Sequence, residues 1–166
     1  RVCAGGPPPG RPPPGGPAHP RGLGPGAVAP APGDPQDAAA VQETVGIVDD
    51  ATIKASHGLS GGGGLCGEGT CGALTGGLMA LSAKRGRGRD QLHRGRFIGN
   101  FQKGHELVER FRAEFGGVTC RELQLRFAGR TYDMWRPEEY EAFSVARGQQ
   151  CALATAQVTR WVVEVL

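Results

Sequence analysis

The sequence predicts an all-α fold: a single small bundle of five or six helices with a glycine-rich loop. Apolar residues recur at alternating steps of three and four along several segments, which is the spacing of one face of a helix. Capping residues and glycines bound these segments. No stretch alternates apolar and polar residues as a half-buried strand does, and hairpin signals are absent. Such helices must pack around one shared core.

Two short helices are expected before the glycine-rich loop of residues 58–69. Segment 37–45 (DAAAVQETV) is broken by Gly46, and segment 49–56 (DDATIKAS) begins at an aspartate cap and is stopped by Gly58. The loop itself leads into a helical pattern over 70–85.

Four further helical segments follow segment 70–85. The clearest is 96–117, whose large apolar residues and one glycine share a face: Phe97, Phe101, Gly104, Val108, Phe111 and Phe115. Segment 119–127 comes next. Pro137 suits the first turn of segment 137–147. Segment 149–166 carries a stripe at three-four spacing: Cys151, Ala154, Val158, Trp161 and Val165.

The first 35 residues are predicted to be a disordered segment that precedes a helical domain of residues 36–166. They contain twelve of the 13 prolines and almost no large apolar side chains. Such a stretch cannot bury enough surface to offset the entropy lost on ordering. Because no apolar run approaches the ~18 residues that cross a bilayer, we expect no membrane insertion and a cytoplasmic location.

Three of the four domain cysteines fall at predicted helix starts. Thr119 and Glu122 fit a capping box, which puts Cys120 at the first helical position. Thr70 can cap the helix that opens with Cys71, and Cys151 lies in a first turn after Gly148. Unpaired amides and the helix dipole favour a thiolate, so we expect lowered thiol pKa values.

Glycine is expected to serve these thiols in two ways. Small residues at helical spacing, such as Gly72 with Gly76 and Ala73 with Gly77, let another backbone approach closely. The loop Gly61–Gly64 can adopt positive φ and leave its N–H groups facing an anion.

Other readings of these residues are weaker but remain open. Buried cysteines often act as small apolar core residues. Zinc is disfavoured because only Cys66 and Cys71 form a pair, with C-x4-C spacing. The G-x-G-x-x-G match that begins at Gly67 lacks a preceding strand, and no Walker lysine follows, so no nucleotide is expected. The basic segment 83–96 lacks interleaved aromatic residues; we interpret it as a solvated connection and expect no nucleic acid.

The segments CGALTG (71–76) and FGGVTCREL (115–123), with RTYDMW and the late Cys151, resemble the C-GCAxxG-C-C family of redox-active proteins. The resemblance runs from about residue 38 to 166 and implies small helical proteins with four characteristic cysteines. A related domain in split-Soret cytochromes holds an iron–sulfur cluster. By resemblance, Cys71, Cys120 and Cys151 match three of the four. The family's opening cysteine lies in an upstream helix that this chain lacks or has altered.

The leading hypothesis is therefore a redox protein in which Cys71, Cys120 and Cys151 converge, with Cys66 as a candidate fourth ligand. An iron–sulfur cluster, of the 2Fe-2S type, would transfer electrons to a partner protein, and a second subunit of a homodimer could complete the ligand set. No haem is expected, since C-x-x-C-H is absent. The alternatives are a metal-free thiol–disulfide protein, in which Cys71 attacks, and a non-redox helical binding or scaffold module.

Four residues outside the cysteine set are also candidates. Arg121 and Arg130 could offset thiolate charge, although arginines are usually exposed for other reasons. Asp133 and Trp135 lie in a loop that could cover the site, and Trp135 could instead cap the core.

Overall fold

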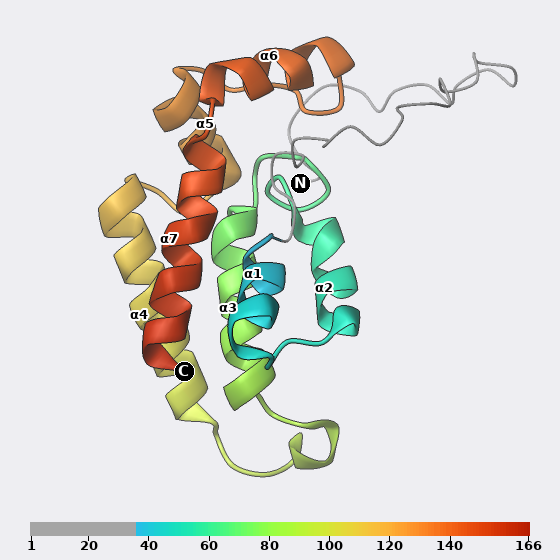
Figure 1. Cartoon of the computed structure of the whole chain (residues 1–166), viewed down its shortest axis with the longest axis vertical. Helices are drawn as coiled ribbons and strands as arrows, with labels where there is room; N and C mark the ends of the chain where they lie inside the picture. The colour runs from blue at the N-terminus through green and yellow to red at the C-terminus, as the bar shows by residue number, and fades with distance from the viewer. Residues whose placement is uncertain (1–35) are drawn as a thin grey trace, which may run out of the picture. The chain divides into compact units, whose positions relative to one another are not determined.

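Seven α-helices make up residues 36–166, the part of the chain that the computed structural model describes (Figure 1). They are α1 (Gln36–Val45), α2 (Asp50–Ser56), α3 (Gly72–Arg85), α4 (Ile98–Phe115), α5 (Cys120–Ala128), α6 (Pro137–Arg147) and α7 (Gln150–Val165). The all-α prediction is confirmed. The described residues hold seven α-helices, more than the expected five or six, and each of them corresponds to a segment that the sequence predicted to be helical.

Local capping chemistry sets several helix ends as the sequence indicates. The Asp49 carboxylate accepts a hydrogen bond from the backbone N–H of Thr52 at 2.8 Å and starts α2. Thr119 and Glu122 form the predicted capping box at the start of α5. Gly116 and Gly129 adopt left-handed conformations that end α4 and α5. Helix α3 begins at Gly72, so Cys71 itself is its N-cap and Thr70 lies before it.

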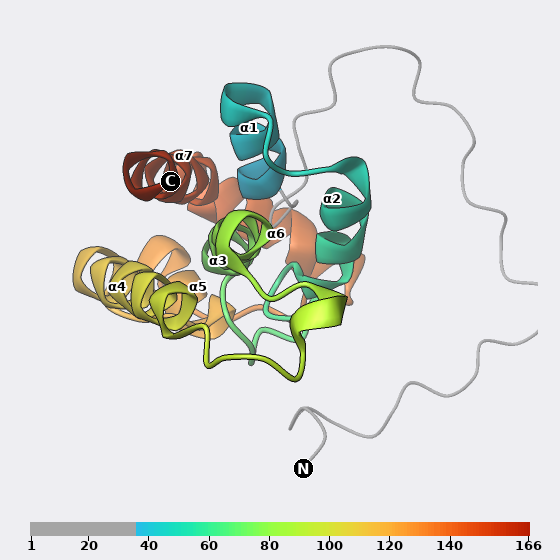
Figure 2. The same cartoon turned by 90° about the horizontal axis from the view of Figure 1, so that it is seen from below.

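Helix α3 is the centre of the packing. It contacts α1, α2, α4 and α7, and the view along its axis shows it surrounded by them (Figure 2). Leu74 and Leu81 on α3 pack in one buried cluster with Phe111 of α4 and Val158 of α7. The predicted stripes on α3 and α7 therefore do face the core.

The predicted stripe on α4 is only partly buried. Phe111 is fully buried and Phe115 packs against the core, but 66% of Phe101 is exposed and Phe97 precedes the helix in a left-handed conformation. Leu107 takes part in the core instead. Periodicity identified the helix but could not say where along it the neighbouring helices stop covering the apolar face.

The glycines of α3 allow the close helix contacts that the sequence suggested. A Cβ added to Gly77 would lie 2.4 Å from Val158 Cγ1 and 3.2 Å from Leu107 Cδ2. No real Cβ tolerates the first of these distances. Helices α4 and α7 can thus approach α3 only because residue 77 has no side chain.

The proposed disordered segment 1–35, and with it the domain boundary after residue 35, lies outside the described residues and stays a prediction. Within residues 36–166, none of the helices combines the length and the apolar character that a membrane span requires.

We expect Gly77→Ala to lower the free energy of unfolding by about 1–3 kcal/mol, because the added methyl group overpacks the α3–α7 contact. Urea denaturation measures the change. Gly99→Ala in α4 is the matched control: nothing lies within 4 Å of an added Cβ there, so this variant should be neutral or stabilised by up to about 1 kcal/mol. Equal destabilisation of both variants would contradict the close contact.

Candidate functional site

Three backbone hydrogen bonds join the start of α3 to the start of α5. The N–H of Cys71 donates to the carbonyl of Val118 at 2.8 Å, and the N–H of Cys120 donates to the carbonyl of Gly69 at 3.0 Å. The N–H of Arg121 donates to the carbonyl of Gly67 at 2.8 Å. Thr70 and Thr119 form an isolated antiparallel bridge between these bonds. Two cysteines 49 positions apart are thereby held on adjacent backbone segments.

The glycine loop folds onto itself before it meets α5. Gly61, Gly62, Gly63 and Gly64 all have positive φ, as predicted, and so does Leu65. Two of these four amides are bonded within the loop: the N–H groups of Gly63 and Gly64 donate to the carbonyls of Leu59 and Gly58. The N–H groups of Gly67 and Gly69 donate to the carbonyls of Gly61 and Gly62. The amides of Gly63 and Gly64, which the prediction assigned to an anion, are therefore used by internal hydrogen bonds.

Gly62 lies between Cys66 and Cys120. The Cys66 thiol donates to the carbonyl of Gly62 at 3.2 Å, and a Cβ added to Gly62 would lie 3.1 Å from the Cβ of Cys120. Gly62 also has φ of +81°. The bare backbone at this position therefore lets the loop that carries Cys66 approach the first turn of α5.

The pKa of the Cys120 thiol is raised, whereas the sequence predicted that it would be lowered. Burial raises the pKa of Cys120 from 9.0 to about 11, and the charges of Cys151 and Cys66 add to this rise. The expected lowering fails for two reasons. The amides of Cys120 and Arg121 already donate to loop carbonyls, and the amide of Glu122 donates to Thr119. The destabilisation of the Cys120 thiolate by burial is then larger than its stabilisation by the helix dipole.

A buried glutamine contacts Cys120 and opposes this rise. The side chain of Gln124 is 1% exposed, and its Nε2 donates to Cys120 Sγ at 3.8 Å, which lowers the pKa of that thiol. Its Oε1 accepts from the backbone N–H of Tyr132 at 2.8 Å. One amide therefore links the Cys120 sulfur to the loop between α5 and α6.

Cys151 lies in the first turn of α7 and has a different neighbour. Burial raises its pKa as well, against the prediction, while the Arg147 guanidinium lowers it by charge and by hydrogen bonding. Arg147 is the last residue of α6, and Gly148 makes the turn between the two helices. The two partly buried thiols thus differ in environment: the Arg147 guanidinium lies beside Cys151, and the neutral Gln124 amide contacts Cys120.

Cys71 is placed between the site and the core. It caps α3, its carbonyl accepts from the N–H of Thr75 at 2.9 Å, and its side chain packs against the apolar cluster. The charges that raise the Cys120 pKa come from Cys151 and Cys66. A shared site of Cys120 with these two sulfurs and a direct role for Cys71 both stay predictions.

The fit of these cysteines to a metal group is mixed. Several soft sulfur donors near one another suit an iron–sulfur cluster in type. In residues 36–166, however, no three His, Cys, Asp or Glu side chains lie in an arrangement that could hold a metal ion. Two of the thiols also carry raised pKa values, whereas ligation requires thiolates. As arranged here, the residues do not form a ligand cage.

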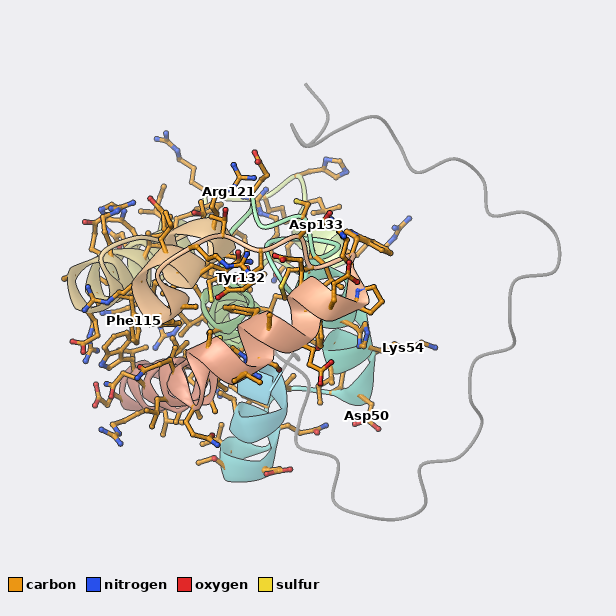
Figure 3. The ribbon with its side chains drawn as sticks, turned by 90° about the horizontal axis from the view of Figure 1, so that it is seen from above. Asp50, Lys54, Phe115, Arg121, Tyr132 and Asp133 are labelled. Carbon is orange, nitrogen blue, oxygen red and sulfur yellow. The ribbon has the colours of Figure 1, made fainter. Side chains whose placement is uncertain are left out.

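The other predicted residues surround the site without contacting its sulfurs through any described bond. Arg121 pairs with Glu68 at 2.5 Å, and Arg130 pairs with Glu139 at 2.7 Å. Both arginines are about half exposed, as the simpler interpretation expected. Figure 3 views this end, where Tyr132 and Asp133 lie near α6 and Arg121 lies on α5.

Trp135 covers the glycine loop and not the core. Its indole N–H donates to the carbonyl of Gly64 at 3.0 Å, while 72% of its side chain is exposed. The Asp133 carboxylate accepts from the backbone N–H of Trp135 at 3.1 Å and shapes the turn. The loop after α5 is thus attached to the glycine loop that carries Cys66.

In a comparison with known protein families, residues 38–165 match the family model described as "Putative redox-active protein (C_GCAxxG_C_C)". The chain belongs to this family. No curated protein and no solved structure matches it. Membership in the C_GCAxxG_C_C family supports a redox role in general terms, and the family match confirms the resemblance found in the sequence.

Two residues of this C_GCAxxG_C_C site were missed in the sequence. Gln124 follows Cys120 by four positions, the spacing of neighbours on a helix face, and this was the available signal. Arg147 precedes Cys151 across a helix break, where no periodic signal exists. Only the turn at Gly148 brings them together.

The raised pKa of Cys120 predicts a loss of stability at alkaline pH. A thiol whose folded pKa exceeds its unfolded value contributes stability below pH 9, and this contribution disappears as the pH rises through about 11. Between these values, the free energy of unfolding should fall more for the wild type than for Cys120→Ala. Urea titrations at successive pH values measure the difference. Parallel pH profiles would contradict the burial of this thiol.

Gln124→Leu should raise the pKa of Cys120 further and destabilise the fold by about 1–3 kcal/mol, because the thiolate loses a donor and the Tyr132 amide loses its acceptor. Peptide-level alkylation by iodoacetamide, followed against pH, measures the first effect. Gln102→Leu, at an exposed position of α4, is the control. An unchanged Cys120 titration would rule out the hydrogen bond.

Proposed function

We propose that the protein is a thiol–disulfide redox protein in which Cys120 and Cys151 form the reacting pair and Cys66 is a third sulfur beside Cys120. The main support for this proposal is electrostatic. Burial is the largest cause of the raised Cys120 pKa, and the charges of Cys151 and then Cys66 raise this pKa further. Groups 31 positions apart affect each other in this way only when they are close in space. Membership in a redox-active family supports the same conclusion.

The two environments suggest which thiol reacts first. Burial raises the pKa of both thiols, but the Arg147 guanidinium opposes this rise at Cys151, whereas Cys120, with a pKa of about 11, has only a neutral amide beside it. Cys151 therefore attacks an external disulfide, forms a mixed disulfide and releases one thiol. Cys120 then attacks the Cys151 sulfur, gives up its proton, and releases the second thiol. Two electrons and two protons pass from the protein pair to the external disulfide.

The same environments indicate whether the Cys120–Cys151 pair acts as a reductant or as an oxidant. A dithiol form is stabilised when its thiolates are stabilised, and here burial does the reverse for both sulfurs. Both thiols are protonated and neutral at neutral pH, so the dithiol form gains none of the thiolate stabilisation that makes a pair oxidising. The pair should therefore be a reductant rather than an oxidant of other thiols.

An iron–sulfur cluster for electron transfer is the second candidate. Its support is the charge effect of Cys151 and Cys66 on Cys120, together with the C-x4-C spacing of Cys66 and Cys71. A cationic cluster would also compensate buried thiolates. The lack of a ligand cage in the described residues is why it ranks second.

Mild oxidation of the reduced protein should remove two thiols and join Cys120 to Cys151, as identified by peptide mass mapping. Cys120→Ser and Cys151→Ser should each abolish this reversible loss, whereas Cys71→Ser should retain it. Iron and sulfide are assayed on the same anaerobically purified protein. An iron-containing, coloured protein would favour the second candidate, and a thiol content that oxidant leaves unchanged would refute the thiol–disulfide function.

A further inference from the structure

The strongest concentration of charge on the chain lies in the connection between α3 and α4, far from the thiols. Residues 84–96 contain six Lys or Arg residues and one acidic residue, Asp90, which gives a local net charge of +5 against +3 for the whole chain. All of these charged residues are exposed. We call residues 84–101 the basic loop. Figure 1 shows it projecting from the end of the bundle opposite α6.

Large apolar side chains are exposed among these charges. Leu92, Ile98 and Phe101 are 54%, 48% and 66% exposed. Exposed apolar residues scattered singly are ordinary, but here three occur within ten positions of one basic segment. Their exposure to water is unfavourable, and the positive charges in the same segment repel a cationic partner.

The basic loop has a defined shape. The Arg87 guanidinium donates to the carbonyls of Leu92 at 3.2 Å and Gly95 at 3.1 Å, and it lies 5.0 Å from the centre of the Phe97 ring. Arg87 thus links the start of the loop to the backbone at Leu92 and Gly95. Of its other arginines, Arg85 donates to the carbonyl of Val165 at 2.9 Å, and Arg89, Arg94 and Arg96 are exposed.

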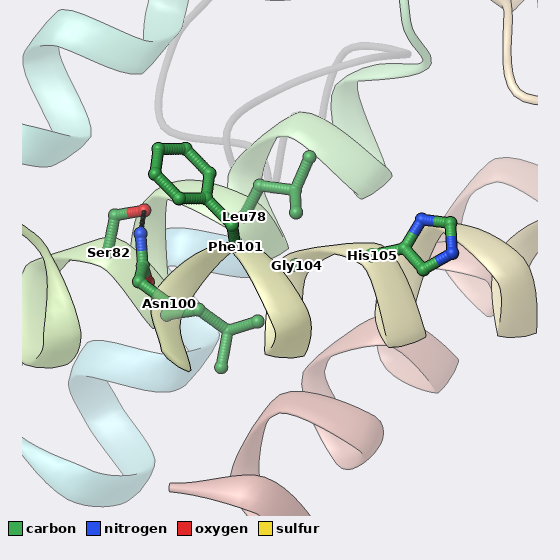
Figure 4. Close-up of a pocket in the computed structure, with 7 residues that line it drawn as sticks. Leu78, Ser82, Asn100, Phe101, Gly104 and His105 are labelled. Atoms are coloured by element: carbon green, nitrogen blue, oxygen red, sulfur yellow. Dashed lines mark hydrogen bonds between the residues drawn. The ribbon is translucent and has the colours of Figure 1, made fainter. Parts of the chain in front are cut away.

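An apolar hollow adjoins the loop. A pocket of about 230 Å³ opens between α3 and α4, with Leu78, Phe101, Gly104 and His105 in its wall (Figure 4). Phe101 belongs both to this wall and to the three exposed apolar residues. Phe101 therefore connects the exposed side chains of the basic loop to a recess that Ser82 and Asn100 also line.

We propose that the basic loop is a peripheral docking surface for anionic phospholipid membranes. Lys and Arg side chains are attracted to anionic headgroups, and exposed Leu, Ile and Phe side chains gain by entering the boundary between headgroups and acyl chains. Nucleic acid would use the charges and the exposed ring of Phe101, but it would leave the aliphatic side chains of Leu92 and Ile98 without a partner. The combination of charge with Leu92, Ile98 and Phe101 therefore favours a lipid surface. Adsorption of this kind requires no spanning helix.

The experiment is co-sedimentation of the full chain with vesicles of phosphatidylcholine alone or of phosphatidylcholine with phosphatidylglycerol. We expect binding to the mixed vesicles only, and release at high salt because exposed charges are screened. Arg94→Glu with Arg96→Glu should weaken partitioning by at least about twentyfold, from about fivefold for each cation lost. Lys54→Glu with Arg160→Glu, an equal change of charge at exposed positions outside the loop, is the control.

The apolar contribution is tested by Leu92→Ser and Phe101→Ser, which alter exposed side chains and should leave the fold intact by circular dichroism. Both should weaken vesicle binding at constant charge. The proposal is overturned by equal binding to neutral vesicles, by absence of binding at low salt, or by equal losses in test and control variants. It is also overturned if a double-stranded oligonucleotide binds more tightly than vesicles and Leu92→Ser leaves that binding unchanged.

Discussion

The short antiparallel contact between residues 67–71 and 118–121 is the constraint on which the candidate site depends. Its three backbone hydrogen bonds, from Cys71, Cys120 and Arg121, join the beginnings of two helices that α4 separates in the chain. Backbone bonds at helix starts satisfy donors that would otherwise need water or side chains. The same bonds use the amides that could have stabilised a thiolate, so the contact both assembles the site and keeps Cys120 protonated.

The site is asymmetric because its two partly buried thiols have different neighbours. Cys120 receives a hydrogen bond from a neutral amide, and Cys151 lies beside a guanidinium. Burial raises both pKa values, but only the arginine supplies a full positive charge against it. A division of labour between a first and a second thiol follows from this difference. The buried Gln124 extends the asymmetry, since it connects Cys120 to the loop that carries Trp135.

The two ends of the helical unit have different chemistry. The thiols, the glycine loop and α6 lie at one end, and the basic loop lies at the other (Figure 1). Helix α3 runs between them, with Cys71 as its cap and Arg85 as its last residue. If the basic loop rests on a membrane, the thiols face away from it, toward partners in solution. The docking and redox hypotheses can therefore fail independently, because they share no residues.

The sequence by itself determined the helices, several of their ends and the family. Three-four periodicity, the Thr119 capping box and the glycine C-caps are local properties, and local contacts specify them. It did not determine the thiol environments. The pKa of Cys120 depends on burial by residues distant in the chain and on amides bonded to Gly67 and Gly69. Likewise, the turn at Gly148 brings Arg147 to Cys151, and the α3–α7 packing decides which part of α4 is covered. Desolvation and pairing are set by what surrounds a group in space, so only the tertiary structure could supply them.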